Sequence, residues 1–216
     1  MLLDVTDEND YAEYYRRLGE TFLDGAAEGL RTLPIPELGD AINALRLARR
    51  DGNRVYALGN GGSASTASHL VCDLVKTATR QGEQPLRAFA LNDNTAVLTA
   101  YANDVHYDET FSMQLAANAE PGDIVIVISA SGSSPNVLTT LHTGRRLGLT
   151  TMGMLGCNGG SALDLVDIPI VVDSSDFGII ETAHIAIVHA FAAALMAPDP
   201  QHAVALTAVR QPAVLG

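Results

Sequence analysis

A histidine and a carboxylate stand one helical turn apart in a helix predicted at residues 63–79. His69 and Asp73 are four positions apart, so both lie on the same face of that helix. This spacing suits a pair of metal ligands, but it is also common on the solvated face of an amphipathic helix. The pair is therefore either a chemical site or an ordinary surface pair, and the rest of the sequence has to discriminate between them.

A second group of ionisable side chains lies on a helix predicted at residues 178–197, which is otherwise mostly apolar. Its members are Glu181, His184 and His189, and ionisable groups in such surroundings are uncommon unless they are paired or functional. At about 100° per residue, Glu181 and His189 stand about 80° apart around the axis and can flank one pocket. His184 points about 140° away from His189, so it is not expected to join it. The alternative is a core histidine and a carboxylate placed favourably near the helix start.

A serine-rich loop follows a predicted strand and precedes a helix predicted at residues 135–147. Residues 129–136 read SASGSSPN, with four serines in the first six positions. Ser134 is expected at the N-cap and Pro135 at the first helical position. Because a helix start offers free backbone N–H groups and a positive dipole end, the loop predicts a phosphate site, with a plain turn as the alternative.

A glycine-rich loop, GNGGSA at residues 59–64, follows another predicted strand. It formally matches the dinucleotide-binding fingerprint, which also needs an acidic residue about 20 positions later at the end of the next strand. Asp73 comes too early and lies in a helix, whereas Asp93 comes rather late. A sugar phosphate shared with the serine loop fits better, and Ser63 is expected to cap the following helix.

The elements that must position these groups alternate along the chain. Two amphipathic helices are predicted at Asn9–Leu30 and Pro36–Arg50, and five buried strands follow. The strands are predicted at 54–59, 86–91, 123–129, 150–155 and 168–173, with helices at 63–79, 94–118, 135–147 and 178–197. This alternation predicts an α/β fold with a flavodoxin-like, doubly wound, five-stranded parallel sheet. Such sheets bind ligands at the carboxyl ends of their strands, where both loops fall.

Composition limits the partners. The 216 residues carry a formal charge of −12, and the sequence pI is about 4.7, which argues against binding nucleic acid or an anionic membrane. Two distant cysteines make no disulfide framework. The N-terminus lacks a signal-peptide pattern, and the longest apolar run is too short to span a membrane. A soluble, cytoplasmic protein is expected.

Together these segments resemble the sugar isomerase (SIS) domain family, and within it the phosphoheptose isomerases. The marks of the resemblance are GNGGSA followed by His69, AND at 102–104, SASGSSPNV at 129–137 and ETAHIAIVHA at 181–190. The resemblance implies an N-terminal helical oligomerisation segment (1–52), a SIS domain (53–198) and a C-terminal tail (199–216). It also implies a homotetramer that isomerises sedoheptulose 7-phosphate to D-glycero-D-manno-heptose 7-phosphate.

The resemblance further implies the residues of the site. The implied substrate-binding residues are Asn60, Gly61, Gly62, Ser63, Asp73, Asn103, Asp104, Ser129, Ala130, Ser131, Ser134 and Glu181. The implied ligands of one Zn²⁺ ion are His69, Asp73, Glu181 and His189. Three positions depart from the family pattern: Asp73 replaces a glutamate, Glu181 replaces a glutamine and Ser133 replaces an asparagine.

The implied reaction moves a proton between two neighbouring carbons through an enediol. By the resemblance, Asp73 is the base and His189 is the partnering acid or base. Glu181, a carboxylate where the family has an amide, is an alternative base. A divalent metal would polarise the sugar oxygens.

Three other functions stay open at this point. One is a non-catalytic SIS protein that binds the bacterial replication initiator, but that family lacks the last histidine, which this chain keeps as His189. Another is a sugar-phosphate-sensing regulatory domain, which usually carries a DNA-binding module. A third is an isomerase of a different phosphorylated sugar, such as a heptose or octose of secondary metabolism.

Overall fold

The computed structural model describes residues 8–79 and 84–198 and contains a five-stranded parallel sheet. The strands are β1 (Arg54–Gly59), β2 (Arg87–Ala90), β3 (Ile124–Ser129), β4 (Thr150–Gly156) and β5 (Ile168–Val172). Their spatial order is β2-β1-β3-β4-β5, and every neighbouring pair is parallel. The order reverses between β1 and β3, as in flavodoxin-like sheets. The predicted fold class is confirmed.

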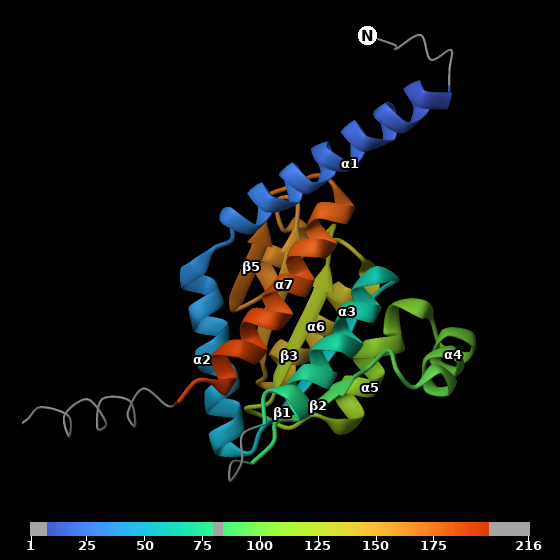
Figure 1. Cartoon of the computed structure of the whole chain (residues 1–216). Coiled ribbons are helices and arrows are strands. Elements are labelled where there is room, and N and C mark those ends of the chain that lie inside the picture. The colour runs from blue at the N-terminus through green and yellow to red at the C-terminus, as the bar shows by residue number, and fades with distance from the viewer. Residues whose placement is uncertain (1–7, 80–83, 199–216) are drawn as a thin grey trace, which may run out of the picture.

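Helices cover both faces of the sheet (Figure 1). They are α1 (Glu8–Arg31), α2 (Ile35–Asp51), α3 (Gly62–Cys72), α4 (Thr95–Asp104), α5 (Thr110–Asn118), α6 (Pro135–Leu147) and α7 (Phe177–Met196). One hydrophobic cluster joins α2, α3 and α7 to one face, and a second joins α5 and α6 to the other. Because α2 shares the first cluster with the sheet, it belongs to the same core.

The central strand β3 shows why the sheet forms. Its sequence, IVIVIS, is buried along its whole length. Successive side chains point to opposite faces, so Ile126 enters the α7 side and Val127 the α6 side. Such continuous β-branched runs are typical of parallel strands covered by helices on both faces.

Two predicted helices differ from the structure. The helix predicted at 94–118 is interrupted: α4 ends at Asp104, and a short 3-10 turn, Tyr107–Glu109, precedes α5. The chain leaves the helix at Val105. His106 is extended, and its Nδ1 accepts a hydrogen bond from the Asp108 N–H at 3.2 Å, which caps the 3-10 turn. The helix predicted at 63–79 changes into a π-helical turn at Asp73–Thr77.

The predicted cap of α3 was wrong. Gly61, not Ser63, is the N-cap residue, and no side chain caps this helix. Gly61 has φ 55° and ψ −123°, a conformation that glycine reaches without the steric cost of a Cβ. Ser63 therefore lies inside the first turn, where it is buried.

The C-terminal half of α1 packs on the start of α7. A Cβ on Gly25 or Gly29 would lie within 2.7 Å or 3.0 Å of the Ile179 side chain, so these two glycines form a groove for Ile179. The N-terminal half extends beyond the rest of the molecule (Figure 1). It carries four exposed large apolar side chains, Tyr11, Tyr14, Tyr15 and Leu18, and the exposed Phe22 and Leu23 follow in the next turn.

Helix α7 is the central helix of the first cluster. Its 20 residues and hydropathy of 1.7 would suit a membrane span by length and composition. However, its buried side chains, which include Ile187, Val188 and Phe191, pack against the sheet. The packing of α7 in the first cluster therefore accounts for its apolar character.

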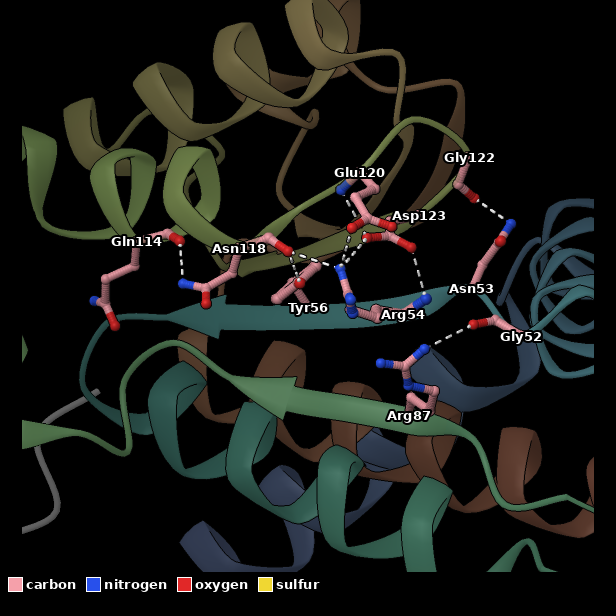
Figure 2. A network of polar contacts seen from close by, with 10 residues as sticks. All are labelled: Gly52, Asn53, Arg54, Tyr56, Arg87, Gln114, Asn118, Glu120, Gly122 and Asp123. Atoms are coloured by element: carbon pink, nitrogen blue, oxygen red, sulfur yellow. Dashed lines mark hydrogen bonds and ion pairs between the residues drawn. The ribbon is translucent and has the colours of Figure 1, made fainter.

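A polar network closes the amino edge of the sheet (Figure 2). The Asp123 carboxylate accepts hydrogen bonds from the backbone N–H groups of Arg54, at 2.7 Å, and Glu120, at 2.9 Å. The Arg54 side chain and the Tyr56 hydroxyl both donate to the Asn118 carbonyl, at 2.9 and 2.8 Å. Burial raises the pKa of the Tyr56 phenol, which favours its neutral, donating form. The network joins the turn before β3 to the start of β1.

Candidate functional site

The two loops singled out in the sequence lie next to each other at the carboxyl edge of the sheet. Gly59, at the end of β1, is in register with Ile128 of β3. The residues that follow, Asn60 and Ser129, therefore begin the glycine loop and the serine loop from neighbouring strands. This edge is where doubly wound sheets place their ligands.

Three ionisable side chains converge between α3 and α7. His69 Nε2 lies 3.3 Å from His189 Nε2 and 3.5 Å from Asp73 Oδ2. The ligand atoms of all three residues lie within 4.8 Å of one another. The fold thus brings together residues that are 120 positions apart in the chain.

The π-helical turn positions Asp73 within this cluster. The Asp73 carbonyl accepts a hydrogen bond from the Ala78 N–H five residues later, at 2.7 Å, and such π-turns inside α-helices are frequent at functional sites. The Asp73 residue is 8% exposed, and its Oδ1 accepts a hydrogen bond from the Thr77 hydroxyl at 2.9 Å. This bond orients the carboxylate and leaves Oδ2 facing His69.

The three side chains fit a zinc ion. Two nitrogens bound to one tetrahedral zinc at about 2.0–2.1 Å would lie roughly 3.4 Å apart, and the two histidine nitrogens are separated by 3.3 Å. Two imidazoles and a carboxylate are zinc ligands, and three protein ligands leave one tetrahedral position open, as in catalytic zinc sites. The donor set and its spacing therefore match a catalytic metal site.

Glu181, the fourth predicted ligand, is not a member of this group of three. Among the described residues, the group of closely spaced donors contains His69, Asp73 and His189, and Glu181 is outside it. Its carboxylate rests against the first turn of α3: a Cβ on Gly62 would lie 2.5 Å from both Glu181 Oε atoms. The positive end of the α3 dipole favours an anion there. The Glu181 carboxylate occupies the space that a side chain at position 62 would need.

The serine loop has the features of an anion site. Ser134 is the N-cap of α6 and Pro135 is its first residue, as predicted, and the Ser134 hydroxyl makes no capping hydrogen bond. Pro135 has no N–H, and the N–H groups of Val137 and Leu138 donate to the Ser134 carbonyl at 3.0 and 3.1 Å. The first turn therefore offers an anion its positive dipole end and the Asn136 N–H. The hydroxyls of Ser129 and Ser131 accept hydrogen bonds from the N–H groups of Gly132 and Ser133, at 3.1 and 3.3 Å, so they shape the loop.

A second glycine pair supports the serine loop from the β4 side. A Cβ on Gly132 would lie 1.9 Å from the Gly159 carbonyl, and one on Gly160 would lie 2.3 Å from the Ser131 carbonyl. The Gly132 carbonyl also accepts a hydrogen bond from the Ala162 N–H at 2.8 Å. This support was not predicted, although the pair Gly159 and Gly160 directly after β4 was a visible signal in the sequence.

Two further residues were missed, and both contact Asn60. The carboxamides of Asn60 and Asn136 form two reciprocal hydrogen bonds, each of 2.9 Å, and the Tyr107 hydroxyl donates to Asn60 Oδ1 at 3.0 Å. Asn136 belongs to the first turn of α6 and is 1% exposed. The bond from Tyr107 ties the 3-10 turn after α4 to the glycine loop. No spacing in the sequence indicates these contacts, because they join three separate segments.

The remaining predicted residues are placed as follows. Asn103 and Asp104 are exposed at the end of α4, where the Asn103 amide donates to the Asp104 carboxylate at 2.7 Å. Asp93, the candidate partner of a dinucleotide ribose, accepts hydrogen bonds from Ser68, at 2.5 Å, and Asn92, at 3.0 Å. Asp93 is thus engaged with its neighbours, which weakens the dinucleotide alternative.

His184 does not join the cluster, as its angle on the helix predicted. It is 0% exposed, and neither ring nitrogen has a well-formed hydrogen bond. Burial lowers its pKa to about 4, with a weak opposing contribution from the Leu155 backbone. His184 is therefore a neutral core residue at neutral pH.

Comparison with known proteins places the chain in a family. The family model described as SIS domain matches residues 22–156. The phosphoheptose isomerase of Geobacter sp. (strain M21) is 40% identical over 154 residues, which cover 71% of this chain and 80% of the relative. The probable phosphoheptose isomerase of Thermoplasma acidophilum is 37% identical over 168 residues, covering 78% and 92%.

Solved structures agree with the sequence relatives. A phosphoheptose isomerase from Francisella tularensis superposes with a TM-score of 0.78 at 27% identity, covering 86% of this chain and 97% of that one. The corresponding protein from Neisseria gonorrhoeae gives a TM-score of 0.76 at 25% identity, covering 84% and 98%. With its parallel sheet, its serine loop and the match over residues 22–156, the chain belongs to the SIS domain family.

Proposed function

We propose that this protein is an aldose-ketose isomerase of phosphorylated sugars and that its substrate is sedoheptulose 7-phosphate, converted to D-glycero-D-manno-heptose 7-phosphate. The observation that carries the proposal is the cluster of His69, Asp73 and His189, whose ligand atoms lie within 4.8 Å of one another. The cluster occurs in a chain that is 40% identical to a phosphoheptose isomerase over 154 residues. The reaction is an intramolecular oxidation and reduction, because one carbon is oxidised as its neighbour is reduced.

The serine loop would hold the phosphate, and the glycine loop would hold the open-chain sugar. Ser129, Ala130, Ser131 and Ser134 would surround the phosphate at the α6 N-terminus, where an acidic protein can bind an anion without lysine. Asn60, Gly61, Gly62 and Ser63 would face the sugar, with Asn103 and Asp104 on the α4 side.

Asp73 and His189 are the proposed proton-transfer pair. Asp73 would remove the proton from the carbon beside the carbonyl, and His189 would exchange protons with the neighbouring oxygen, so that an enediol forms and collapses to the product. The bond from Thr77 to Asp73 Oδ1, at 2.9 Å, leaves Oδ2 as the oxygen for this role. Because Oδ2 is also the oxygen that faces His69, proton transfer and metal binding by Asp73 are alternative roles.

Glu181 is the second candidate base, and its position favours it in one respect. Its carboxylate rests on Gly62 of the sugar loop, whereas Asp73 is among the proposed metal ligands. A carboxylate outside the ligand set keeps both oxygens available for proton transfer.

We further propose that His69, Asp73 and His189 hold one Zn²⁺ ion. The family resemblance implies Glu181 as a fourth ligand, and the metal content of Glu181→Gln tests whether it is one. The spacing of the first three donors supports the metal. A divalent ion there would supply polarisation of the sugar oxygens next to the reacting carbons.

A cytoplasmic homotetramer completes the proposal. The exposed apolar side chains on α1 from Tyr11 to Leu23 support self-association, since large contiguous apolar surfaces are rarely left exposed on a monomer. Sedimentation at micromolar concentration measures the assembly, and a stable monomer would contradict it.

The activity is tested by incubating the protein with sedoheptulose 7-phosphate in deuterated water. The expected product is an aldose phosphate that carries deuterium beside the carbonyl. Neither turnover nor exchange with any C5 to C8 ketose phosphate would contradict the function. Elemental analysis of the purified protein, and the rate after treatment with a chelator, test the metal separately.

Two matched substitutions separate the carboxylates. Asp73→Asn is expected to lower the metal content, because it removes a ligand. It is also expected to lower kcat by more than about 100-fold, because it removes the proposed base. Glu181→Gln, which has the same shape, is expected to leave metal content unchanged and kcat within about tenfold. If Glu181→Gln instead abolishes turnover while the metal is retained, Glu181 is the base.

A further inference from the structure

The Asn60 carboxamide is held by three hydrogen bonds from two other segments. Its Nδ2 donates to Asn136 Oδ1 and its Oδ1 accepts from Asn136 Nδ2, both at 2.9 Å. The same Oδ1 accepts from the Tyr107 hydroxyl at 3.0 Å. A planar amide with this many bonds cannot rotate without breaking at least two of them.

The donor and acceptor inventory decides what Asn60 can offer a ligand. A carboxamide oxygen has two lone pairs, and the NH₂ group has two hydrogens. Both lone pairs of Asn60 Oδ1 are used, one by Asn136 and one by Tyr107. Nδ2 makes one bond within the described part of the chain. Asn60 is thus left with a single N–H donor, and it has no acceptor to offer.

We propose that Asn136 and Tyr107 are positioning residues that hold Asn60 so that it presents one fixed N–H donor to a sugar oxygen that becomes negative during isomerisation. The inference rests on the proposed function, because the negative oxygen belongs to the enediolate. A donor fixed in advance stabilises such an oxygen without reorganisation, and removal of one comparable donor typically costs about 10²–10³ in kcat.

The same contacts couple the two halves of the site. Asn136 lies in the first turn of α6, immediately after the serine loop, and is 1% exposed. Asn60 follows β1 and lies in the glycine loop. The paired carboxamides therefore set the distance between the proposed phosphate site and the proposed sugar site, which a substrate of fixed length requires.

A kinetic double-mutant cycle tests the proposal with Asn60→Ala, Tyr107→Phe and the double variant. Tyr107 is 48% exposed, so loss of its hydroxyl leaves packing unchanged. Tyr107→Phe is expected to lower kcat about tenfold and to leave KM within about twofold of wild type. Asn60→Ala is expected to lower kcat about 100-fold. The double variant is expected to match Asn60→Ala, because Tyr107 acts through Asn60.

Tyr56→Phe is the matched control. It also removes a tyrosine hydroxyl that donates a hydrogen bond, here to the Asn118 carbonyl at 2.8 Å, but at the other edge of the sheet. Its kcat is expected to equal that of the wild type. If Tyr107→Phe behaves like this control, or if it lowers kcat by the same factor in the Asn60→Ala background, the positioning role is wrong.

A measurement without turnover keeps this inference separate from the proposed function. In ¹⁵N spectra, the Asn60 side-chain NH₂ signals are identified by their loss in Asn60→Ala. Tyr107→Phe is expected to shift them and to speed their exchange with solvent, whereas Tyr56→Phe leaves them unchanged. Unshifted signals in Tyr107→Phe would overturn the positioning role even if the enzyme is active. Wild-type protein that turns over no ketose phosphate would overturn the proposed function, and with it the negative sugar oxygen, but not the positioning of Asn60 by Tyr107.

Discussion

The two edges of the sheet are built from different side chains. At the amino edge, the charged and polar groups satisfy one another: the Asp123 carboxylate is 4% exposed and accepts from two backbone N–H groups. At the carboxyl edge, the histidines His69 and His189 and the serines Ser131 and Ser133 remain exposed. A group whose partners are all within the protein stabilises the fold, whereas a group with free capacity can act on a ligand.

The difference gives each edge its own expected response to substitution. Amino-edge changes should lower stability and leave turnover unchanged, because Asp123 and its partners lie at the far ends of the strands (Figure 2). Changes to exposed side chains at the carboxyl edge, such as His69, Ser131 and His189, should lower turnover and leave stability nearly unchanged, because their removal costs little packing. A substitution that moves both quantities together would break this division.

The largest effect is expected for His189→Ala. We expect kcat to fall about 10²–10⁴-fold, because one proposed proton-transfer group is removed. The unfolding temperature should stay within a few degrees of wild type, since His189 is exposed. Steady-state kinetics with sedoheptulose 7-phosphate and thermal unfolding measure the two quantities. His142→Ala, an exposed histidine on α6, is the matched control and should retain full activity; near-normal turnover of His189→Ala would contradict the proposed pair.

His184 sharpens the comparison, because it lies on the same helix as His189 but inside the core. Its pKa is about 4 in the folded protein, against 6.5 for an unperturbed histidine. The unfolded chain therefore binds this proton at a higher pH than the folded chain does. Above about pH 6.5, neutral His184 contributes its full share to the free energy of unfolding. As the pH falls towards 4, that free energy decreases by about 3 kcal/mol in total, because the unfolded chain binds the proton more readily.

The measurement is urea unfolding of wild type and His184→Leu between pH 7.5 and about pH 4.5. The difference between the two free energies of unfolding is expected to change over this range, because the variant lacks the titrating group. A difference that stays constant with pH would show that His184 does not titrate as its burial predicts.

The smallest of these effects is expected for Asp123→Ala at the amino edge. The backbone N–H groups of Arg54 and Glu120 lose their acceptor, so the free energy of unfolding should fall by about 2 kcal/mol. Turnover should equal that of wild type. Asp51→Ala, which removes only an exposed ion pair with Arg50, should leave stability unchanged. Loss of activity in Asp123→Ala at full stability would contradict the division between the two edges.

Much of the fold was predictable because the strands are local patterns. Runs such as IVIVIS are typical of buried strands in a parallel sheet, and the helical segments between them are long enough for crossovers. The breaks at His106 and Asp73 were not predictable. Each depends on a backbone conformation or hydrogen-bonding pattern that helical periodicity does not encode.

The sequence alone determined the sheet class, the two ligand loops and the residue types of the site, because these follow from periodicity, helix capping and spacing within single elements. Only the tertiary structure decided which of those residues meet. It brings His69 and Asp73 to His189, places Glu181 on Gly62 instead, and joins Asn60 to Asn136 and Tyr107. The physical reason is that these contacts link residues up to 120 positions apart, so they depend on how helices pack on the sheet and on which side-chain conformations that packing leaves open.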